Sequence, residues 1–107
     1  MDIRKNIEQE FRQTVINKYK EYKEQLINLV NDYGRSVNYT KGNFYTEILQ
    51  QLNAINVDDL EWAVVCFNCA VENFLDRKEY CAKTEEQKTI FNKVEELNYK
   101  MKHCVLD

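Results

Sequence analysis

The sequence contains no proline and only two glycines, both within residues 34 to 43. Average usage would give a chain of 107 residues about five prolines and about seven glycines. Because tight turns depend on these two residue types, their scarcity excludes turn-rich β-sandwiches, collagen-like repeats and flexible linkers. An all-helical domain remains.

Long hydrophobic runs are also absent. The longest uninterrupted apolar run extends from Trp62 to Phe67, whereas a transmembrane helix needs about 18 such residues. The first residues lead into an amphipathic stretch and not into the apolar core of a secretory signal. We therefore expect a cytoplasmic protein that binds no membrane, in which the cysteines remain reduced.

Residues that carry common enzyme chemistry are scarce. His103 is the only histidine, and the sequence contains no glycine-rich phosphate loop and no paired-carboxylate signature. A catalytic Cys–His pair would require Cys104 to converge with His103, but neighbours on a helix point about 100° apart. We expect a chain that is not an enzyme and that needs no cofactor.

The four cysteines leave one chemical alternative open. Cys66 and Cys69 form a C-x-x-C pair, followed by Cys81 and Cys104, and four thiolates can hold a zinc ion. However, Cys81 and Cys104 lie 23 positions apart and form no second pair, and a redox C-x-x-C normally opens a helix after a strand. Because free cysteine behaves as a small buried hydrophobe, we favour core or incidental thiols without a metal, and keep a cysteine-based metal or redox protein as a third hypothesis.

Apolar residues recur every three or four positions through the first third of the chain, which is typical of one face of a helix. They are Ile3, Ile7, Phe11, Val15, Tyr19, Tyr22, Leu26, Leu29 and Tyr33. Gly34 follows as the expected left-handed C-cap, so the pattern predicts a helix over about residues 2–32. Up to Val15 every step is four, which rotates the stripe by about 40° per step. The N-terminal third therefore faces a different neighbour, or the helix bends or breaks near Gln13–Thr14.

The middle of the chain predicts two helices. The first runs from about Asn43 to Ile55, and the second covers about residues 58–80. Asp58 and Glu61 are placed as an acidic capping box for the longer helix, with Val57 and Trp62 as its hydrophobic staple. Its first turns are apolar all round, which is typical of a central, buried helix.

Thr84 and Gln87 form a capping box that opens the last helix. The inward seam of this helix consists of Ile90, Val94, Leu97, Met101 and Cys104. Four amphipathic helices joined by short connections predict an all-α fold, an antiparallel four-helix bundle with a long first helix, as a single domain over residues 1–107.

The charge pattern bears on the kind of partner. The chain has 15 basic and 18 acidic residues, a net charge of −3, which argues against nucleic-acid binding. Polar and acidic residues recur at helical spacing along the third helix, namely Glu61, Asn68, Glu72, Asp76 and Glu79. This stripe is either a solvated face or a surface that steers a basic protein partner into contact.

Tyrosine is the second feature that bears on function. Seven tyrosines are present, and those not all needed for the core are Tyr22, Tyr33, Tyr39, Tyr45 and Tyr80. Because tyrosine is favoured at protein interfaces, we take Tyr39 and Tyr45 as candidate binding residues. Our leading hypothesis is a non-enzymatic inhibitor or immunity protein that neutralises a toxin or nuclease through the acidic stripe and these two tyrosines. The alternative is a structural or assembly module whose first helix docks on a partner helix or on a second copy, as a homodimer.

Overall fold

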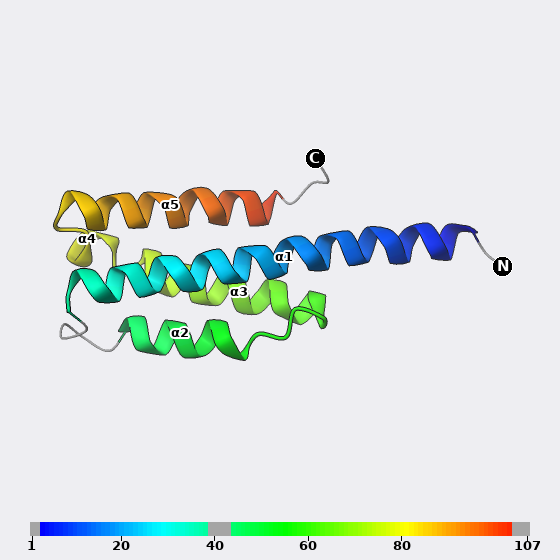
Figure 1. Cartoon of the computed structure of the whole chain (residues 1–107), viewed down its shortest axis with the longest axis horizontal. Coiled ribbons are helices and arrows are strands. Elements are labelled where there is room, and N and C mark those ends of the chain that lie inside the picture. Colours follow the sequence, from blue (N-terminus) through cyan, green and yellow to red (C-terminus); the bar gives the residue numbers. More distant parts are fainter. Residues whose placement is uncertain (1–2, 39–43, 104–107) are drawn as a thin grey trace.

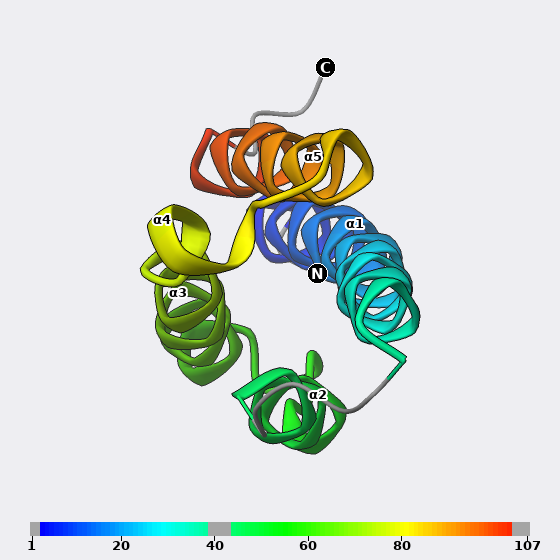
Figure 2. The same ribbon diagram turned by 90° about the vertical axis from the view of Figure 1, so that its left-hand side faces the viewer.

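The computed structural model describes residues 3–38 and 44–103, and the side chains of residues 9–38 and 44–103. The described residues form α1 (Ile3–Ser36), α2 (Phe44–Ala54), α3 (Leu60–Leu75), α4 (Lys78–Cys81) and α5 (Glu85–Lys102) (Figure 1). The four longer helices surround one core, in which α1 packs against α2 and α5, and α3 packs against the same two helices (Figure 2). The predicted all-α bundle with a long first helix is confirmed.

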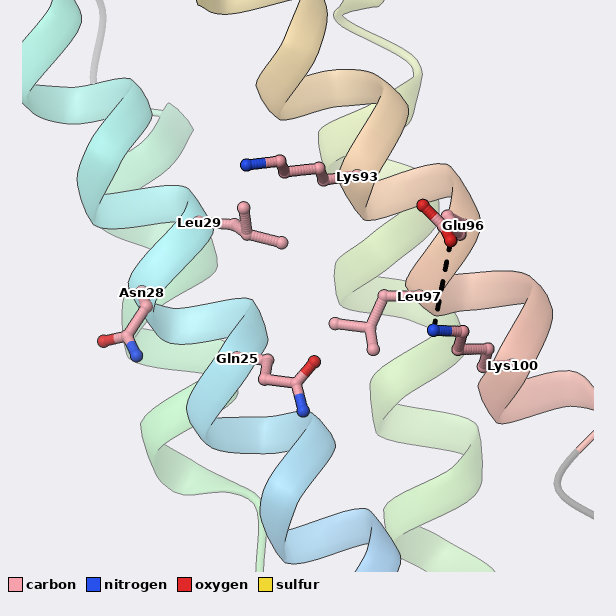
Figure 3. A pocket seen from close by; sticks show the side chains of 7 residues that line it. All are labelled: Gln25, Asn28, Leu29, Lys93, Glu96, Leu97 and Lys100. Atoms are coloured by element: carbon pink, nitrogen blue, oxygen red, sulfur yellow. Dashed lines mark ion pairs between the residues drawn. The ribbon is translucent and has the colours of Figure 1, made fainter. Parts of the chain in front are cut away.

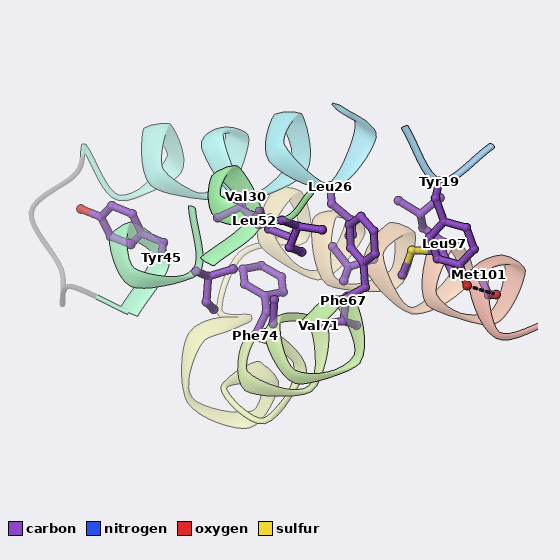
Figure 4. Close-up of a cluster of buried hydrophobic side chains, with 14 of the residues drawn as sticks. Tyr19, Leu26, Val30, Tyr45, Leu52, Phe67, Val71, Phe74, Leu97 and Met101 are labelled. Carbon is purple, nitrogen blue, oxygen red and sulfur yellow. Dashed lines mark hydrogen bonds between the residues drawn. The ribbon is translucent and has the colours of Figure 1, made fainter. Parts of the chain in front are cut away.

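Aromatic rings form the centre of the core. Phe74 of α3 and Phe91 of α5 stack with ring centroids 4.4 Å apart and planes 14° from parallel. Tyr33 of α1 meets both rings edge-on, at centroid distances of 5.8 and 5.7 Å. Figure 4 shows Phe67 and Phe74 pointing from α3 into the middle of the bundle. Because burying one such side chain stabilises the fold by about 1.5–3 kcal/mol, these contacts hold the helices together.

The long helix α1 continues past Gly34, so the predicted glycine C-cap is wrong. The backbone N–H groups of Val37 and Asn38 donate to the carbonyls of Gly34 and Arg35, at 3.3 and 3.0 Å, and close the last turn beyond the glycine. Gly34 itself is buried within the helix. The left-handed residue is Asn38, with φ of 54°, a conformation that asparagine tolerates better than most residues.

The N-terminal part of α1 leaves the bundle without a break in the helix. At about 1.5 Å per residue, the 34 residues of α1 span about 50 Å, close to the 56 Å length of the molecule. This end of α1 projects past the end of α5 (Figure 1), and residues 9–14 are exposed, with Phe11 54% accessible. Burial begins at Ile16. The change in apolar spacing at Val15 therefore marks the point where burial of α1 begins, and the helix is unbroken at Gln13–Thr14.

The third predicted helix is shorter than expected and is followed by a separate turn. The prediction covered residues 58–80, but α3 ends at Leu75 and α4 begins at Lys78. At this junction the guanidinium of Arg77 lies 5.2 Å from the centre of the Phe44 ring, at the start of α2. The chain changes direction here, and α4 connects α3 to α5. The spacing of apolar residues does not predict this change of direction.

The start of α3 also differs from the prediction. Its N-cap is Asp59, which makes no side-chain capping bond, so the acidic capping box of Asp58 and Glu61 is wrong. Both carboxylates bind α1 instead: Asp58 pairs with Lys20 at 3.5 Å, and Glu61 pairs with Arg12. Long-range ion pairs thus replace the local capping interaction.

The predicted staple between Val57 and Trp62 does not form, because Val57 is buried whereas Trp62 is 64% exposed. The prediction that the start of α3 is buried all round is wrong for the same reason. One face of α3 is buried and the opposite face meets solvent.

The last helix follows its sequence signals closely. The Gln87 N–H donates to Thr84 Oγ1 at 3.1 Å, and the Thr84 N–H donates to Gln87 Oε1 at 3.2 Å, so the predicted capping box is confirmed. Of the predicted inward seam, the buried residues are Ile90, Val94, Leu97 and Met101. Cys104, the last member of that seam, lies outside the described residues.

Candidate protein-binding surface

Among the described residues, no helix packs against one side of α3, and we call this side the outward face of α3. It consists of Trp62, Val65, Cys69, Glu72 and Asp76, all exposed. Their spacing of three and four residues places them on one side of a helix. The opposite side of α3 is buried in the core through Ala63, Phe67, Ala70, Val71 and Phe74. Packing in the bundle therefore determines which residues of α3 a partner can reach.

The first half of the outward face is apolar. Trp62 is 64% exposed and Val65 is 47% exposed, one helical turn apart. Phe11 of α1 is exposed at the same end of the bundle, since its neighbour Arg12 is paired with Glu61 of α3. Single exposed apolar residues are normal. Tryptophan, however, is enriched among the residues that contribute most of the binding energy at protein interfaces.

The second half of the outward face is acidic. Glu72 and Asp76 are exposed, as is Glu79 in α4, and none of the three forms an ion pair with any residue that the structure describes. The nearby Lys78 is already paired with Glu95 of α5, at 2.7 Å. These three carboxylates are thus without direct ion pairs among the described residues, and Lys78 and Lys88 line the groove that Asp76 and Glu79 border.

Glu61 belongs to the same predicted stripe but has a different environment. Both of its carboxylate oxygens accept hydrogen bonds from the guanidinium of Arg12, with 3.0 Å between Nη2 and Oε2. These bonds lower the pKa of Glu61 from its ordinary 4.5 to about 2. The charge of Glu61 is thus balanced by Arg12, so this end of the stripe offers less attraction to a basic partner than the other end.

The remaining predicted site residues are placed differently. Asn68 is half-buried, on the flank of the outward face. Tyr45 is only 2% exposed and packs against Phe44 and Tyr33, at centroid distances of 5.8 and 6.2 Å. It belongs to the core, because the first turn of α2 faces the aromatic cluster, and its assignment to a binding surface is corrected. Tyr39 lies outside the described residues.

Trp62 and Val65 were missed as surface residues in the sequence. The run from Trp62 to Phe67 is continuously apolar, and this pattern hides which side of the helix is buried. A signal was nonetheless present, because the spacing of Trp62, Val65 and Cys69 leads directly into that of Glu72 and Asp76. Two apolar residues in register with carboxylates indicate one solvent-facing stripe.

The cysteines within the described residues are free thiols. Cys69 is exposed, whereas Cys66 and Cys81 are half-buried. Among the described side chains, no three histidines, cysteines or carboxylates come close enough together to hold a metal ion. None of the helices described combines the length and the apolarity needed to cross a membrane.

A shallow groove lies between α1 and α5, with a volume of about 300 Å³. Leu29 and Leu97 line its apolar part, Gln25 borders it on α1, and the ion pair of Glu96 and Lys100 borders it on α5, with 3.9 Å between the charged atoms (Figure 3). The side-chain amide of Gln25 and the ion pair offer hydrogen bonds, but no nucleophile with an adjacent base lines this groove.

Comparison of the chain with models of protein families, with curated proteins and with solved structures finds no match.

Proposed function

We propose that this chain is a non-enzymatic cytoplasmic binding protein that neutralises a basic toxin or nuclease by covering it with the outward face of α3. The observation that carries the proposal is the composition of that face. It joins the exposed Trp62 and Val65 to the carboxylates Glu72 and Asp76, which form no ion pair with the described residues.

The two halves of the face have complementary physical roles. Trp62 supplies a large apolar side chain that can enter a pocket of the partner, where it is desolvated and contributes most of the binding energy. Glu72 and Asp76 supply a negative field that raises the rate of encounter with a basic surface. A nuclease needs such a basic surface for its phosphate substrate, so carboxylates bound there would block it.

The dimensions of the face agree with this role. From Trp62 to Asp76 the chain advances 14 residues, which is about 21 Å along a helix axis. A typical specific interface buries about 800 Å² on each partner. A helix face of this length supplies the centre of such an interface, and the flanks of α2 and α5 supply its rim.

The decisive experiment compares two charge reversals that change net charge equally. Glu72→Lys/Asp76→Lys alters the outward face, and Glu21→Lys/Glu24→Lys alters exposed carboxylates of α1 that likewise form no ion pair with the described residues. The partner is identified by capture on the immobilised wild-type protein, and the product of the neighbouring gene is tested first. Association and dissociation rates are then measured by surface plasmon resonance.

We expect the outward-face reversal to slow association strongly, whereas the α1 reversal leaves the rate within about twofold of wild type. Trp62→Ala should accelerate dissociation without changing the melting temperature. Association of the wild-type protein should slow as salt rises, because the Debye length falls from about 10 Å at 0.1 M to about 3 Å at 1 M. Equal rates for the two charge-reversed proteins, at unchanged melting temperatures, would contradict the proposal.

A second candidate, an assembly module, is favoured by the projecting end of α1. Phe11 is 54% exposed on this part of the helix, which projects past the end of α5 (Figure 1). In this case the molar mass measured by light scattering should rise from that of one chain to that of two chains with increasing concentration. Phe11→Glu should abolish the rise, whereas Glu72→Lys/Asp76→Lys should not.

A further inference from the structure

A cleft of about 620 Å³ lies at the end of the bundle opposite to the projecting part of α1. Segments from four places in the sequence converge there: the C-terminus of α1, the N-terminus of α2, α4 and the N-terminus of α5 (Figure 2). We call it the α4 cleft. Its volume is within the range of about 300–1,000 Å³ that is typical of sites for small molecules.

The charged side chains that the structure places on the wall of the α4 cleft are both cations, Arg77 and Lys83. Neither forms an ion pair with a described residue. The neighbouring carboxylates Asp76 and Glu79 line a different groove, against α5. In a chain of net charge −3, a cleft walled by two unpaired cations and no described carboxylate favours an anion.

Arg77 lies over an aromatic ring. Its guanidinium carbon lies 5.2 Å from the centre of the Phe44 ring, a cation–π contact that favours this position of the group. A guanidinium in this position still has N–H groups along its edges, which can donate two parallel hydrogen bonds to a carboxylate or a phosphate. Phe44 thus positions Arg77 and is itself part of the cleft wall.

Gln87 adds a buried amide to the wall of the α4 cleft. It is only 6% exposed, and its Oε1 accepts hydrogen bonds from the N–H groups of Lys83 and Thr84, at 2.9 and 3.2 Å. These bonds fix the orientation of the amide. Its Nε2 donates one hydrogen bond to Ser36 Oγ, at 3.3 Å, and an amide nitrogen carries a second hydrogen. This second N–H can donate one further hydrogen bond.

The rest of the wall includes aromatic rings, those of Tyr33, Phe44 and Tyr80. Tyr33 is buried, and burial raises its pKa well above the usual value, so its phenol stays neutral. Tyr80 is largely exposed at the cleft. A flat ring of a ligand can therefore stack on Tyr80 while its charged group reaches the cations.

We propose that the α4 cleft binds a small organic anion with an aromatic ring, whose oxyanion contacts Arg77 and Lys83 and whose ring packs against Tyr80. The oxyanion is a carboxylate or a phosphate, since Arg77 presents the same pair of donors to both. This site is separate from the outward face of α3, so it does not depend on the function proposed for that face.

The test uses four probes that separate the ring from the charge: phenyl phosphate, benzoate, inorganic phosphate and phenol. Each is titrated into the ¹⁵N-labelled full chain, and backbone amide shifts of residues 33–38 and 77–87 are followed by NMR. We expect saturable shifts with phenyl phosphate or benzoate, and whichever binds more tightly identifies the oxyanion. Inorganic phosphate and phenol should bind at least fivefold more weakly. Absence of saturation with both ring-bearing anions would overturn the proposal, as would equal binding of either control probe.

Variants then assign the binding to the two cations. Arg77→Gln and Lys83→Gln should each raise Kd at least fivefold, and Arg77→Lys should weaken binding because it retains the charge but loses the paired donors. The matched control is Lys102→Gln, an exposed lysine on α5 that forms no ion pair with the described residues, and it should leave Kd unchanged. Because Arg77→Gln also removes the contact with Phe44, Lys83→Gln is the deciding variant. A Kd for Lys83→Gln equal to that of the control would overturn the site.

Discussion

Arg12 and Glu61, 49 positions apart in the sequence, form a bidentate ion pair between the N-terminal part of α1 and the first turn of α3. Both side chains are exposed, and exposed ion pairs contribute little to the free energy of unfolding. The consequence of the pair is geometric. It places the Glu61 carboxylate beside the outward face of α3 and joins α3 to a part of α1 that precedes Ile16, the first buried residue of that helix.

Titration of Glu61 tests this geometry directly. Its pKa of about 2 is set mainly by the hydrogen bond from Arg12, so Arg12→Gln should return the midpoint towards the ordinary value of 4.5. The sign follows from linkage: a carboxyl whose pKa is lowered by folding stabilises the fold fully above its unfolded pKa, and that contribution is lost as pH falls through the folded pKa. The side-chain carboxyl shift, followed by NMR from pH 1.5 to 6, gives the midpoint. The same midpoint in both proteins would mean that the pair does not form in solution.

Truncation of two aromatic residues of α3 should change the free energy of unfolding by very different amounts. Phe74→Ala empties a fully buried site stacked on Phe91 and should lower the free energy of unfolding by about 3–5 kcal/mol. Trp62→Ala, on the exposed side, should change it by about 0.5 kcal/mol or less. Urea denaturation followed by circular dichroism measures both. Since domains of this size are stable by only about 5–15 kcal/mol, the difference is easily resolved, and similar losses would contradict the orientation of α3.

The capping box of α5 is a local interaction that can be measured separately. Thr84→Ala removes the acceptor for the Gln87 N–H and should cost about 1 kcal/mol. Thr89 is a matched control on the same helix, since its hydroxyl donates only to the Glu85 carbonyl one turn before. Thr89→Ala should leave the urea midpoint nearly unchanged. Equal effects of the two substitutions would show that the cap contributes nothing specific.

The left-handed residue after α1 is also testable. Asn38 has φ of 54°, a region that costs a residue with a Cβ about 1–2 kcal/mol, and asparagine somewhat less. Asn38→Ala should therefore lower the melting temperature, whereas Asn38→Gly should preserve or raise it. If the alanine and glycine variants melted at the same temperature, the chain would not be left-handed at this position.

The sequence by itself determined the features that depend on residues within about one helical turn of each other. Apolar residues three and four positions apart predicted the helices of the bundle, and Thr84 and Gln87 predicted the start of α5. The scarcity of glycine and proline excluded other fold classes. The acidic stripe was also visible, because its residues recur on one helix.

Tertiary structure decided which side of each helix is buried and which residues meet across the bundle. Trp62 is exposed and Tyr45 is buried because the neighbouring helices, and not the local sequence, select the buried side of an apolar segment. Glu61 binds Arg12 and forms no capping box with Asp58, because folding brings a guanidinium from α1 within reach of its carboxylate. The α4 cleft likewise exists only where four chain segments converge, a proximity between residues from 33 to 87 that no short-range pattern contains.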